Sequence, residues 1–268
     1  MTNETTLKFW ISGVGLLGPG LPGWSASLNI LSGEHAYTPG ATELPSSAML
    51  PPAERRRIGS AIKLALAISQ EAIETSQLPA AQLASVFCTS GGDSHNCHAI
   101  CEALASNDCR ISPTRFHNSV NNAAAGYWSI ASHAMRASTV LCAYEASFGA
   151  GLLEAATQTV VEGNDVLLAA YDTEYPEPLK AQRPLQTTLG IALVLSACAH
   201  ANSLASATLR LTGETPTLLA NAELESLRRH TSSARGLPLL AALASGKSNR
   251  IILDYLEPLH LCIDIQPC

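Results

Sequence analysis

Strand-like and helix-like segments alternate along the first 200 residues, and this order restricts the possible folds more than any other feature. Short apolar runs, typical of buried strands, are separated by stretches with apolar residues at helical spacing. Strands are expected within 9–20, 83–92, 138–143, 165–179 and 189–199, and helices within 51–78, 94–106, 112–135 and 148–162. Because helical connections favour parallel strands, the order predicts an α/β fold with a mostly parallel sheet covered by helices.

Composition supports a layered α/β protein and argues against some partners. The 268 residues are 47% hydrophobic and only 14% charged, which provides enough apolar side chains for a substantial core. The formal net charge of -6 argues against nucleic acid as the main ligand. Residues 1–10 lack the pattern of a secretory leader, and no run of about 18 apolar residues predicts a membrane span. We therefore expect a cytoplasmic protein with reduced thiols.

Residues 94–101 (SHNCHAIC) bring together four potential metal ligands: His95, Cys97, His98 and Cys101. A zinc site needs four ligands in a tetrahedron, usually as two pairs from different elements. On one helix Cys97 and Cys101 share a face, but no second pair with ligand spacing occurs elsewhere in the sequence. A half-buried helix with incidental His and Cys residues is therefore the favoured interpretation, and no metal is expected.

Two other motifs suggest chemistry that their surroundings do not support. The glycines of 13–20 (GVGLLGPG) lack the Lys-Ser/Thr of a phosphate-binding loop, so they indicate a sharp turn after a strand. Asp93, Ser94 and His95 have the residue types of a catalytic triad, but a triad needs groups that converge from separate elements. The stretch 116–122 (FHNSVNN) is more specific, because polar side chains in such a loop are typical of a site or an interface.

Five stretches together resemble the β-ketoacyl synthases of the thiolase superfamily. They are SGVGLLGPG, RRIGSAIKLALAISQEAIETSQL, SVFCTSGG, ISPTRFHNSVNNAAAGYWSIA and TVLCAYEASFGAGLLEAATQTVVEGNDVLLAAYDTE. The fourth stretch, together with YDTEYPEPL, is similar to a shortened branch of this family, the ketosynthase-like chain length factors of aryl polyene pathways. The resemblance implies a thiolase-like layered α/β/α/β/α fold with a truncated C-terminal half. Residues 1–200 are then the ketosynthase-like half, and 201–268 are a reduced half packed on it as one compact unit.

The resemblance also shows where a nucleophile belongs. In ketosynthases the nucleophilic Cys lies where a strand becomes a helix, ahead of a Gly near the end of that helix. Gly163 matches this glycine, and the position of the nucleophile is Ala146. Cys142 lies four residues earlier, inside the expected strand, where no helix N-terminus activates it, so it is interpreted as structural. The two catalytic His contexts of the family are missing as well, since only His230 and His260 follow residue 200.

The resemblance therefore implies a non-catalytic subunit that pairs with an active β-ketoacyl synthase and shapes the tunnel for the growing acyl chain. It implies no cofactor of the chain's own, because the substrates are carried on the phosphopantetheine arm of an acyl carrier protein that docks transiently. Two alternatives stay open. One is a scaffold that only stabilises the ketosynthase. The other is an independent hydrolase that uses Ser94 or a Cys, although no convergent nucleophile–base pair is found for it.

In the dimers of this family, the loop before the Ala-rich helix reaches across the interface, and the strand at 138–143 is an edge strand that pairs with the partner. The tunnel and interface residues expected from this are Phe116, His117, Asn118, Ser119, Val120, Asn121, Asn122, Ser138, Val140, Cys142, Tyr144 and Phe148. The basic residues Arg55, Arg56 and Arg57 either begin a solvated helix or dock the acidic carrier protein.

Overall fold

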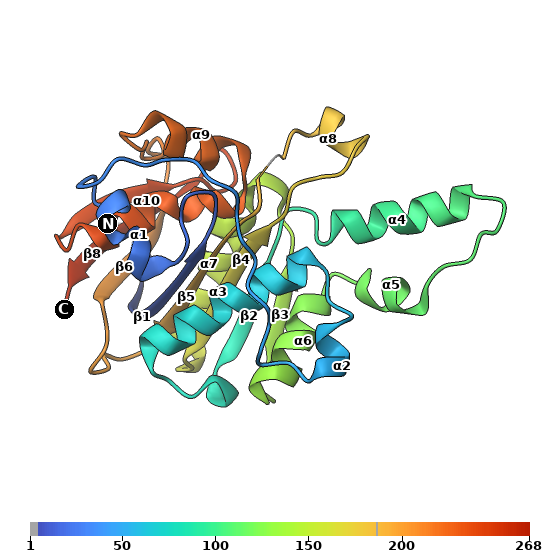
Figure 1. Cartoon of the computed structure of the whole chain (residues 1–268). Coiled ribbons are helices and arrows are strands. Elements are labelled where there is room, and N and C mark those ends of the chain that lie inside the picture. Colours follow the sequence, from blue (N-terminus) through green and yellow to red (C-terminus); the bar gives the residue numbers. More distant parts are fainter. Residues whose placement is uncertain (1–4, 186) are drawn as a thin grey trace.

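The structure is a computed structural model that describes residues 5–185 and 187–268. Eight strands of the described residues form one sheet in the order β3-β2-β4-β5-β1-β6-β8-β7 (Figure 1). The strands are β1 (Leu7–Leu17), β2 (Ala84–Cys88), β3 (Ser138–Leu141), β4 (Val166–Asp172), β5 (Leu189–Ser196), β6 (Ala205–Thr212), β7 (Asn249–Leu253) and β8 (His260–Pro267). The α/β class predicted from the sequence is confirmed.

The prediction of a mostly parallel sheet is wrong. Only β2 pairs in parallel, with β3 on one side and β4 on the other. All other pairs of strands in this sheet are antiparallel. The connection from β4 to β5 explains the difference, because its described residues, 173–185 and 187–188, contain only the four-residue helix α8 (Leu179–Gln182). Without a long crossover helix, the chain returns beside β4 in the opposite direction.

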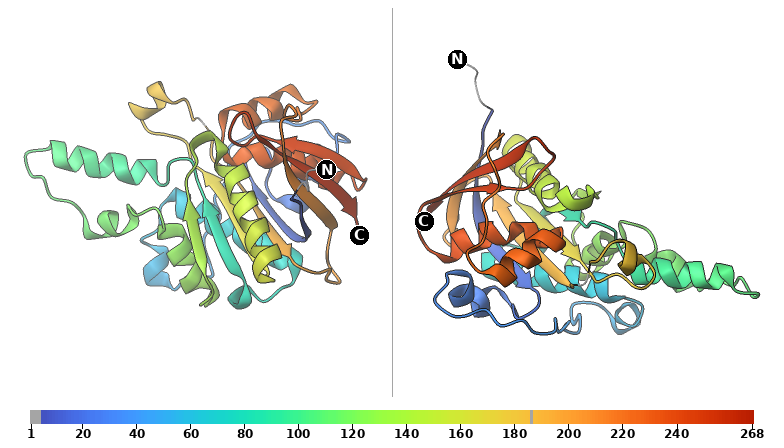
Figure 2. Two further views of the ribbon diagram at one scale, coloured as in Figure 1. Left: turned by 180° about the vertical axis from the view of Figure 1, so that it is seen from behind. Right: turned by 90° about the horizontal axis from the view of Figure 1, so that it is seen from above.

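Helices cover both faces of the sheet. They are α1 (Trp24–Leu31), α2 (Pro52–Arg55), α3 (Ser60–Ser76), α4 (Ser94–Ala105), α5 (Pro113–Asn118), α6 (Ala123–Ser132), α7 (Ser147–Glu162), α9 (Ala222–His230) and α10 (Leu237–Ala244), with 3-10 turns η1 (Ala80–Gln82), η2 (Tyr144–Ala146) and η3 (Ser233–Gly236). Helices α3 and α6 pack on one face, and α7 and α10 on the other. Figure 1 shows α3 in front of the sheet, and the reverse view of Figure 2 shows α7 in front.

The glycine-rich end of β1 has two roles. A Cβ atom on Gly13 or Gly15 would collide with the backbone carbonyl of Ala72 or Ile68, so these glycines let α3 lie directly against β1. The predicted turn is formed at Gly20, whose φ of 63° lies in the left-handed region that favours glycine. The sequence alone indicated the turn but not the close helix contact.

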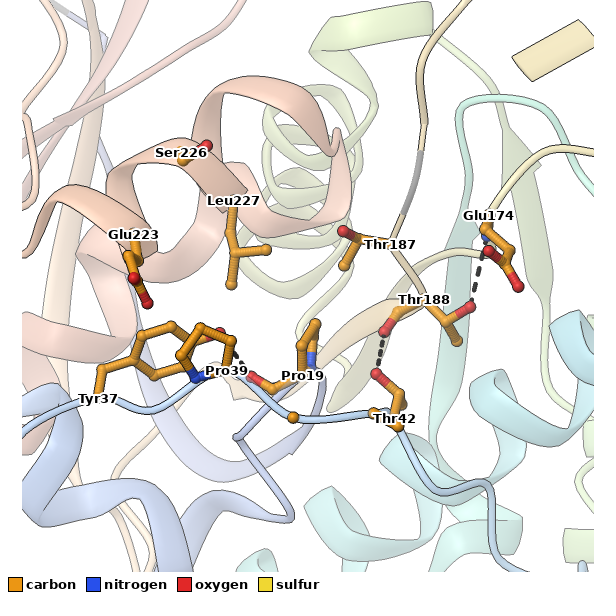
Figure 3. A pocket seen from close by; sticks show the side chains of 12 residues that line it. Pro19, Tyr37, Pro39, Thr42, Glu174, Thr187, Thr188, Glu223, Ser226 and Leu227 are labelled. Atoms are coloured by element: carbon orange, nitrogen blue, oxygen red, sulfur yellow. Dashed lines mark hydrogen bonds between the residues drawn. The ribbon is translucent and has the colours of Figure 1, made fainter. Parts of the chain in front are cut away.

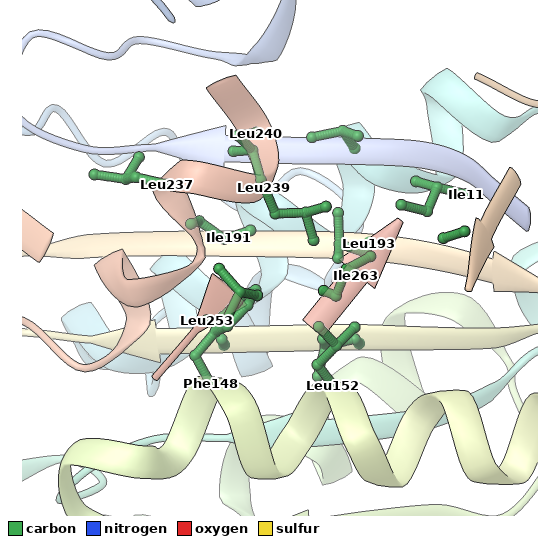
Figure 4. Packing of buried hydrophobic residues seen from close by; sticks show 14 of the residues in the cluster. Ile11, Phe148, Leu152, Ile191, Leu193, Leu237, Leu239, Leu240, Leu253 and Ile263 are labelled. Carbon is green, nitrogen blue, oxygen red and sulfur yellow. The ribbon is translucent and has the colours of Figure 1, made fainter. Parts of the chain in front are cut away.

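The second half of the chain continues the sheet of the first half. β6 pairs with β1, so β6, β8 and β7 extend one sheet rather than form a second one. The side chains of both halves share a core in which Phe148 and Leu152 of α7 lie with Leu237 and Leu240 of α10 and with Leu253 of β7 (Figure 4). The two parts therefore bury their apolar faces together, while the boundary at residue 200 stays a prediction.

Helices α4 and α5 project from the body as an arm, here defined as residues 94–118 (Figures 1 and 2). Only Ser94 and Asn96, both at its base, are buried in α4. A helix of 12 residues is marginally stable in water on its own, because its amphipathic face normally packs on other parts of a protein. The arm thus has the character of an element that another surface covers. Within the described residues, no helix has the length and apolar character to cross a membrane.

Candidate functional site

The turn between β3 and α7 forms a sharp elbow at one edge of the sheet. Tyr144 adopts a φ of 53°, which is strained for a residue with a side chain. Ala146 is the N-cap of α7, and it is buried. Gly163 ends the same helix in the left-handed conformation. The expected elbow and its closing glycine are therefore present, with a methyl group at the position that faces the helix N-terminus.

Cys142 differs from its expected place. It was predicted inside the strand and held by neighbours, but β3 ends at Leu141 and Cys142 is exposed in the turn that follows. Its Sγ lies 3.5 Å from Oδ1 of Asn121, at the end of the FHNSVNN stretch. The strand is shorter than expected because the chain already turns toward η2 at residue 143. The thiol nonetheless stays four residues ahead of the helix N-terminus.

Asp172, at the end of β4, is the most highly connected buried carboxylate near the elbow. Its Oδ1 accepts hydrogen bonds from the backbone N–H of Ser90 at 2.8 Å, from Ser90 Oγ at 2.7 Å and from Thr89 Oγ1 at 3.2 Å. Its Oδ2 accepts from the N–H of Ser233 at 2.8 Å. Burial raises the pKa of Asp172 above its ordinary value, and the hydrogen bonds from Ser90 and Ser233 offset only part of this shift. The carboxylate joins the ends of β2 and β4 to η3, in the C-terminal part.

Replacing Asp172 with Ala is expected to destabilise the protein by roughly 2–5 kcal/mol, because the buried N–H groups of Ser90 and Ser233 lose their acceptor. Chemical denaturation measures the loss. Asp165→Ala is the matched control, since Asp165 immediately precedes β4 and makes a half-exposed pair with His200 at 3.3 Å. The control is expected to change stability by less than about 1 kcal/mol. Equal losses in the two variants would contradict the bridging role of Asp172.

An ion-pair network adjoins the elbow. Arg183 donates to Oε1 of Glu145 at 2.7 Å, and its guanidinium carbon lies 3.9 Å from the ring centroid of Tyr144. Arg235 contacts the other oxygen of Glu145 at 3.3 Å and Asp254 at 3.4 Å. The carboxylate beside Ala146 is therefore fully engaged by two arginines from different parts of the chain.

The network continues into α9. Asp254 also pairs with Arg228, which donates to Glu225 at 2.8 and 2.7 Å. The hydrogen bonds from Arg228 lower the pKa of Glu225 to about 2. The side chains of Glu225, Arg228, Arg235 and Asp254 are paired at low exposure, and none of them is a thiol or an imidazole. The arrangement suits structural cohesion rather than covalent catalysis.

A cavity of about 510 Å³ opens at the same end of the strands as the elbow, but over the central strands of the sheet (Figure 3). It lies between the end of β1, the start of β5 and helix α9. Its polar side chains are hydroxyls, such as those of Thr42, Thr188 and Ser226, and the carboxylates of Glu174 and Glu223. The described residues that line it include neither a thiol nor an imidazole.

The predicted interface residues divide into exposed and buried groups. Phe116 and Val120 expose 67% and 52% of their surface, and Tyr144 is exposed as well. Asn118 is buried, where it donates to the carbonyl of Arg57 at 2.7 Å and accepts from the hydroxyl of Tyr127 at 3.1 Å. The group thus contains both a rigid anchor and outward-facing apolar side chains.

The remaining predicted residues lie around the same turn and edge. Ser138 and Val140 are on β3, the last strand of the sheet, so the predicted edge position is confirmed. His117 packs edge-on against Tyr127, Ser119 donates to the carbonyl of Phe116, and Asn122 is the N-cap of α6. Phe148 does not reach the surface: it is fully buried in the core, where its ring leaves no room for a Cβ on Gly236.

The three arginines at 55–57 have different surroundings in the structure. Arg55 donates to the carbonyls of Ala48 and Leu50, so it fixes the local chain. Arg56 and Arg57 are exposed, and Arg57 pairs with Glu54 at 3.0 Å. The helix expected over 51–78 is interrupted here, because α2 ends at Arg55 and α3 begins at Ser60.

The potential metal ligands do not converge. Cys97 and Cys101 are exposed on α4, and no cluster of three or more His, Cys, Asp or Glu side chains suited to a metal occurs in 5–185 or 187–268. No motif in the sequence indicated the pairing of Glu145 with Arg183 and Arg235. A polar residue ending a buried strand was the one hint for Asp172, because carboxyl ends of strands commonly carry functional side chains.

Comparison with known proteins identifies relatives. The family model described as "Beta-ketoacyl synthase, N-terminal domain" matches residues 31–254. No curated protein sequence matches the chain. Among solved structures, 225 chains match.

Three of these structures contain ketosynthase complexes. The first is a ketosynthase (ApeO) in complex with its chain length factor (ApeC) from Xenorhabdus doucetiae, with 22% identity, a TM-score of 0.71 and coverage of 96% of this chain and 99% of that one. The second is the ishigamide ketosynthase/chain length factor, with 11% identity, a TM-score of 0.72 and coverage of 97% of this chain and 99% of that one. The third is AntDE:AntF, a type II polyketide synthase acyl carrier protein in complex with its ketosynthase, with 14% identity, a TM-score of 0.71 and coverage of 98% of this chain and 100% of that one. At these identities the structures show a shared fold.

Proposed function

Since the chain belongs to the β-ketoacyl synthase family, we propose that it is a chain length factor: a non-catalytic subunit that pairs with an active ketosynthase and shapes the tunnel for the growing acyl chain. Its setting is polyketide or fatty-acid-like synthesis, such as that of aryl polyenes, in the cytoplasm. The acyl chain arrives on the phosphopantetheine arm of an acyl carrier protein, so the subunit has no cofactor of its own.

Ala146 at the N-cap of α7 is the observation that carries the proposal. Decarboxylative condensation needs a thiolate at the elbow and donors that stabilise the developing oxyanion. Ala146 supplies only a methyl group, and the adjacent Glu145 is engaged by Arg183 and Arg235. A chain with this elbow contributes shape to a complex, and the chemistry comes from its partner.

Two unpartnered elements support a permanent partner. β3 pairs with β2 on one side and lies at the end of the sheet on the other, which is the kind of edge that proteins normally cover. In the arm of residues 94–118, α4 contacts α5 but is buried only at Ser94 and Asn96, and Leu104 and Phe116 are exposed. The similar solved structures are described as ketosynthase complexes, which supports a ketosynthase as the partner here.

The hydrolase alternative has one new observation to weigh. On α9, Ser226 Oγ lies 3.4 Å from Nδ1 of His230. The same Nδ1 lies 2.8 Å from the carbonyl oxygen of Ser226, which can only accept a hydrogen bond, so Nδ1 carries the proton and cannot be the base for Ser226. Ser94, the other candidate, is buried. The alternative of a pure scaffold differs from the proposal only in the products that the complex makes.

The isolated chain is expected to condense acyl and malonyl carrier proteins at least about 10³-fold more slowly than the complex with its ketosynthase, because it lacks a nucleophile at the elbow. In the complex, Cys142→Ala is expected to change turnover by less than about twofold, as is Cys198→Ala, an exposed control outside the arm. Product release measured by mass spectrometry checks both. Turnover by the isolated chain that Cys142→Ala abolishes would overturn the proposal.

A further inference from the structure

A second cavity, of about 440 Å³, lies at the base of the arm and uses none of the elbow residues. It opens where α3, α4 and α5 meet. Four of its side chains are basic or potentially basic: Arg56 and Arg57 from the segment before α3, His95 from α4, and Arg115 from α5. Three segments distant in sequence thus direct basic residues to one place, although the chain as a whole carries a net charge of -6.

Two buried asparagines hold this arrangement. Asn118 donates its amide to the carbonyl of Arg57 at 2.7 Å, and Asn96 donates to the carbonyl of Arg115 at 2.8 Å. Both amides belong to residues that are at least nine-tenths buried. Each asparagine therefore fixes the backbone of an arginine that lines the cavity, so the cavity is built before any ligand arrives.

The arginine side chains keep free donors. Among the described residues, the guanidinium groups of Arg56 and Arg115 have no hydrogen-bond or ion-pair partner, and Arg57 uses one nitrogen for Glu54. Asp93 is the one carboxylate among the residues that line the cavity, and its Oδ1 already accepts from the N–H of Asn96 at 3.0 Å. Clustered positive charges with unused N–H groups attract a multivalent anion, for which the fork of arginine is suited.

The N-terminus of α3 also borders the cavity. α3 is 17 residues long, Gly59 at its N-cap provides no side-chain bond, and its first turn contains no acidic residue. Gly59 and Ser60 both line the cavity. Oδ2 of Asp93 already lies against Gly59, 2.7 Å from where a Cβ would stand, so the positive end of the helix dipole faces that carboxylate. The attraction for a further anion therefore comes from the arginines, since three guanidinium groups face this one lining carboxylate.

We propose that this cavity is a phosphate site, which takes the phosphate group of a small phosphate ester or free phosphate. The assignment goes beyond the proposed function and does not depend on it. The volume exceeds that of one phosphate, which leaves space for an organic group, so an ester is expected to bind more tightly than the inorganic ion.

Calorimetric titration of the full chain on its own tests the site with inorganic phosphate and with glycerol 3-phosphate. Saturable binding is expected for at least one of them below about 20 mM, and Arg56→Gln with Arg115→Gln is expected to weaken it at least about tenfold. Arg110→Gln is the matched control, because Arg110 is exposed on the arm and pairs with Asp108 outside the cavity. Melting temperatures show that the variants are folded, since all three arginines are exposed.

The two probes separate the sources of the phosphate group. Tighter binding of glycerol 3-phosphate identifies an ester as the ligand, and tighter binding of inorganic phosphate identifies the free ion. Affinity that is unchanged in the folded double variant would overturn the assignment, as would the absence of saturable binding by both probes.

Discussion

Removing the arm is expected to abolish assembly with the ketosynthase. Asn96 bonds to the carbonyl of Arg115, so the two ends of the arm lie together and a short Gly-Ser turn can replace residues 98–112 without disturbing the body. Beyond its base at Ser94 and Asn96, α4 has no fully buried residue, and Leu104 is 53% exposed, which is costly unless a partner covers it. The affinity of the partner is expected to fall at least about 100-fold, or about 2.7 kcal/mol.

A point variant makes the same test without shortening the chain. Leu104→Lys places a charge on the arm and is expected to weaken the complex at least about tenfold. Leu218→Lys is the matched control, because Leu218 is 60% exposed but precedes α9, away from the arm in sequence and structure. Analytical ultracentrifugation of mixtures measures both. A shortened chain that stays folded and binds the ketosynthase as the wild type does would remove the arm from the interface.

The elements of the fold were largely predictable because each follows from local pattern. The apolar runs that became β2, β4 and β5 are fully buried strands, and the long periodic stretch gave α3. The direction of the strands could not be predicted from local sequence pattern. It depends on whether a helix crosses between strands, and the described residues between β4 and β5 form only α8, which no periodicity rule separates from a loop.

The candidate site was predictable only where one segment defines it. The elbow at Ala146 and the cap at Gly163 lie on one strand–helix unit, so spacing located both. The bridge from Asp172 to Ser233 joins residues 61 positions apart, and no motif links them. The same holds for the basic cavity, since Arg56 was visible in a basic run but Arg115 joins it only through the folding of the arm base. Convergence of distant charges is a property of tertiary structure.

Two exposed apolar residues, Phe116 on α5 and Val120 between α5 and α6, are expected to set the length of the product. Phe116 and Val120 face outward, while Asn118 between them is anchored to the carbonyl of Arg57 and to Tyr127. A loop held rigidly from behind can act as a wall against a growing acyl chain in the partner's tunnel. Pushing one more unit against a packed wall costs on the order of 1–3 kcal/mol, which shifts the product ratio by roughly tenfold or more.

Phe116→Ala or Val120→Ala is therefore expected to lengthen the products of the reconstituted complex, and Val120→Trp is expected to shorten them. Leu218→Ala is the control, as an exposed apolar residue outside this loop. Mass spectrometry of the products gives the distribution, and ultracentrifugation shows that each complex is intact. A shift in length separates a chain length factor from a pure scaffold, because a scaffold changes only the amount of product. An unchanged distribution in intact complexes would leave the loop as a subunit contact alone, since a wall that bounds the acyl chain cannot be moved without changing where elongation stops.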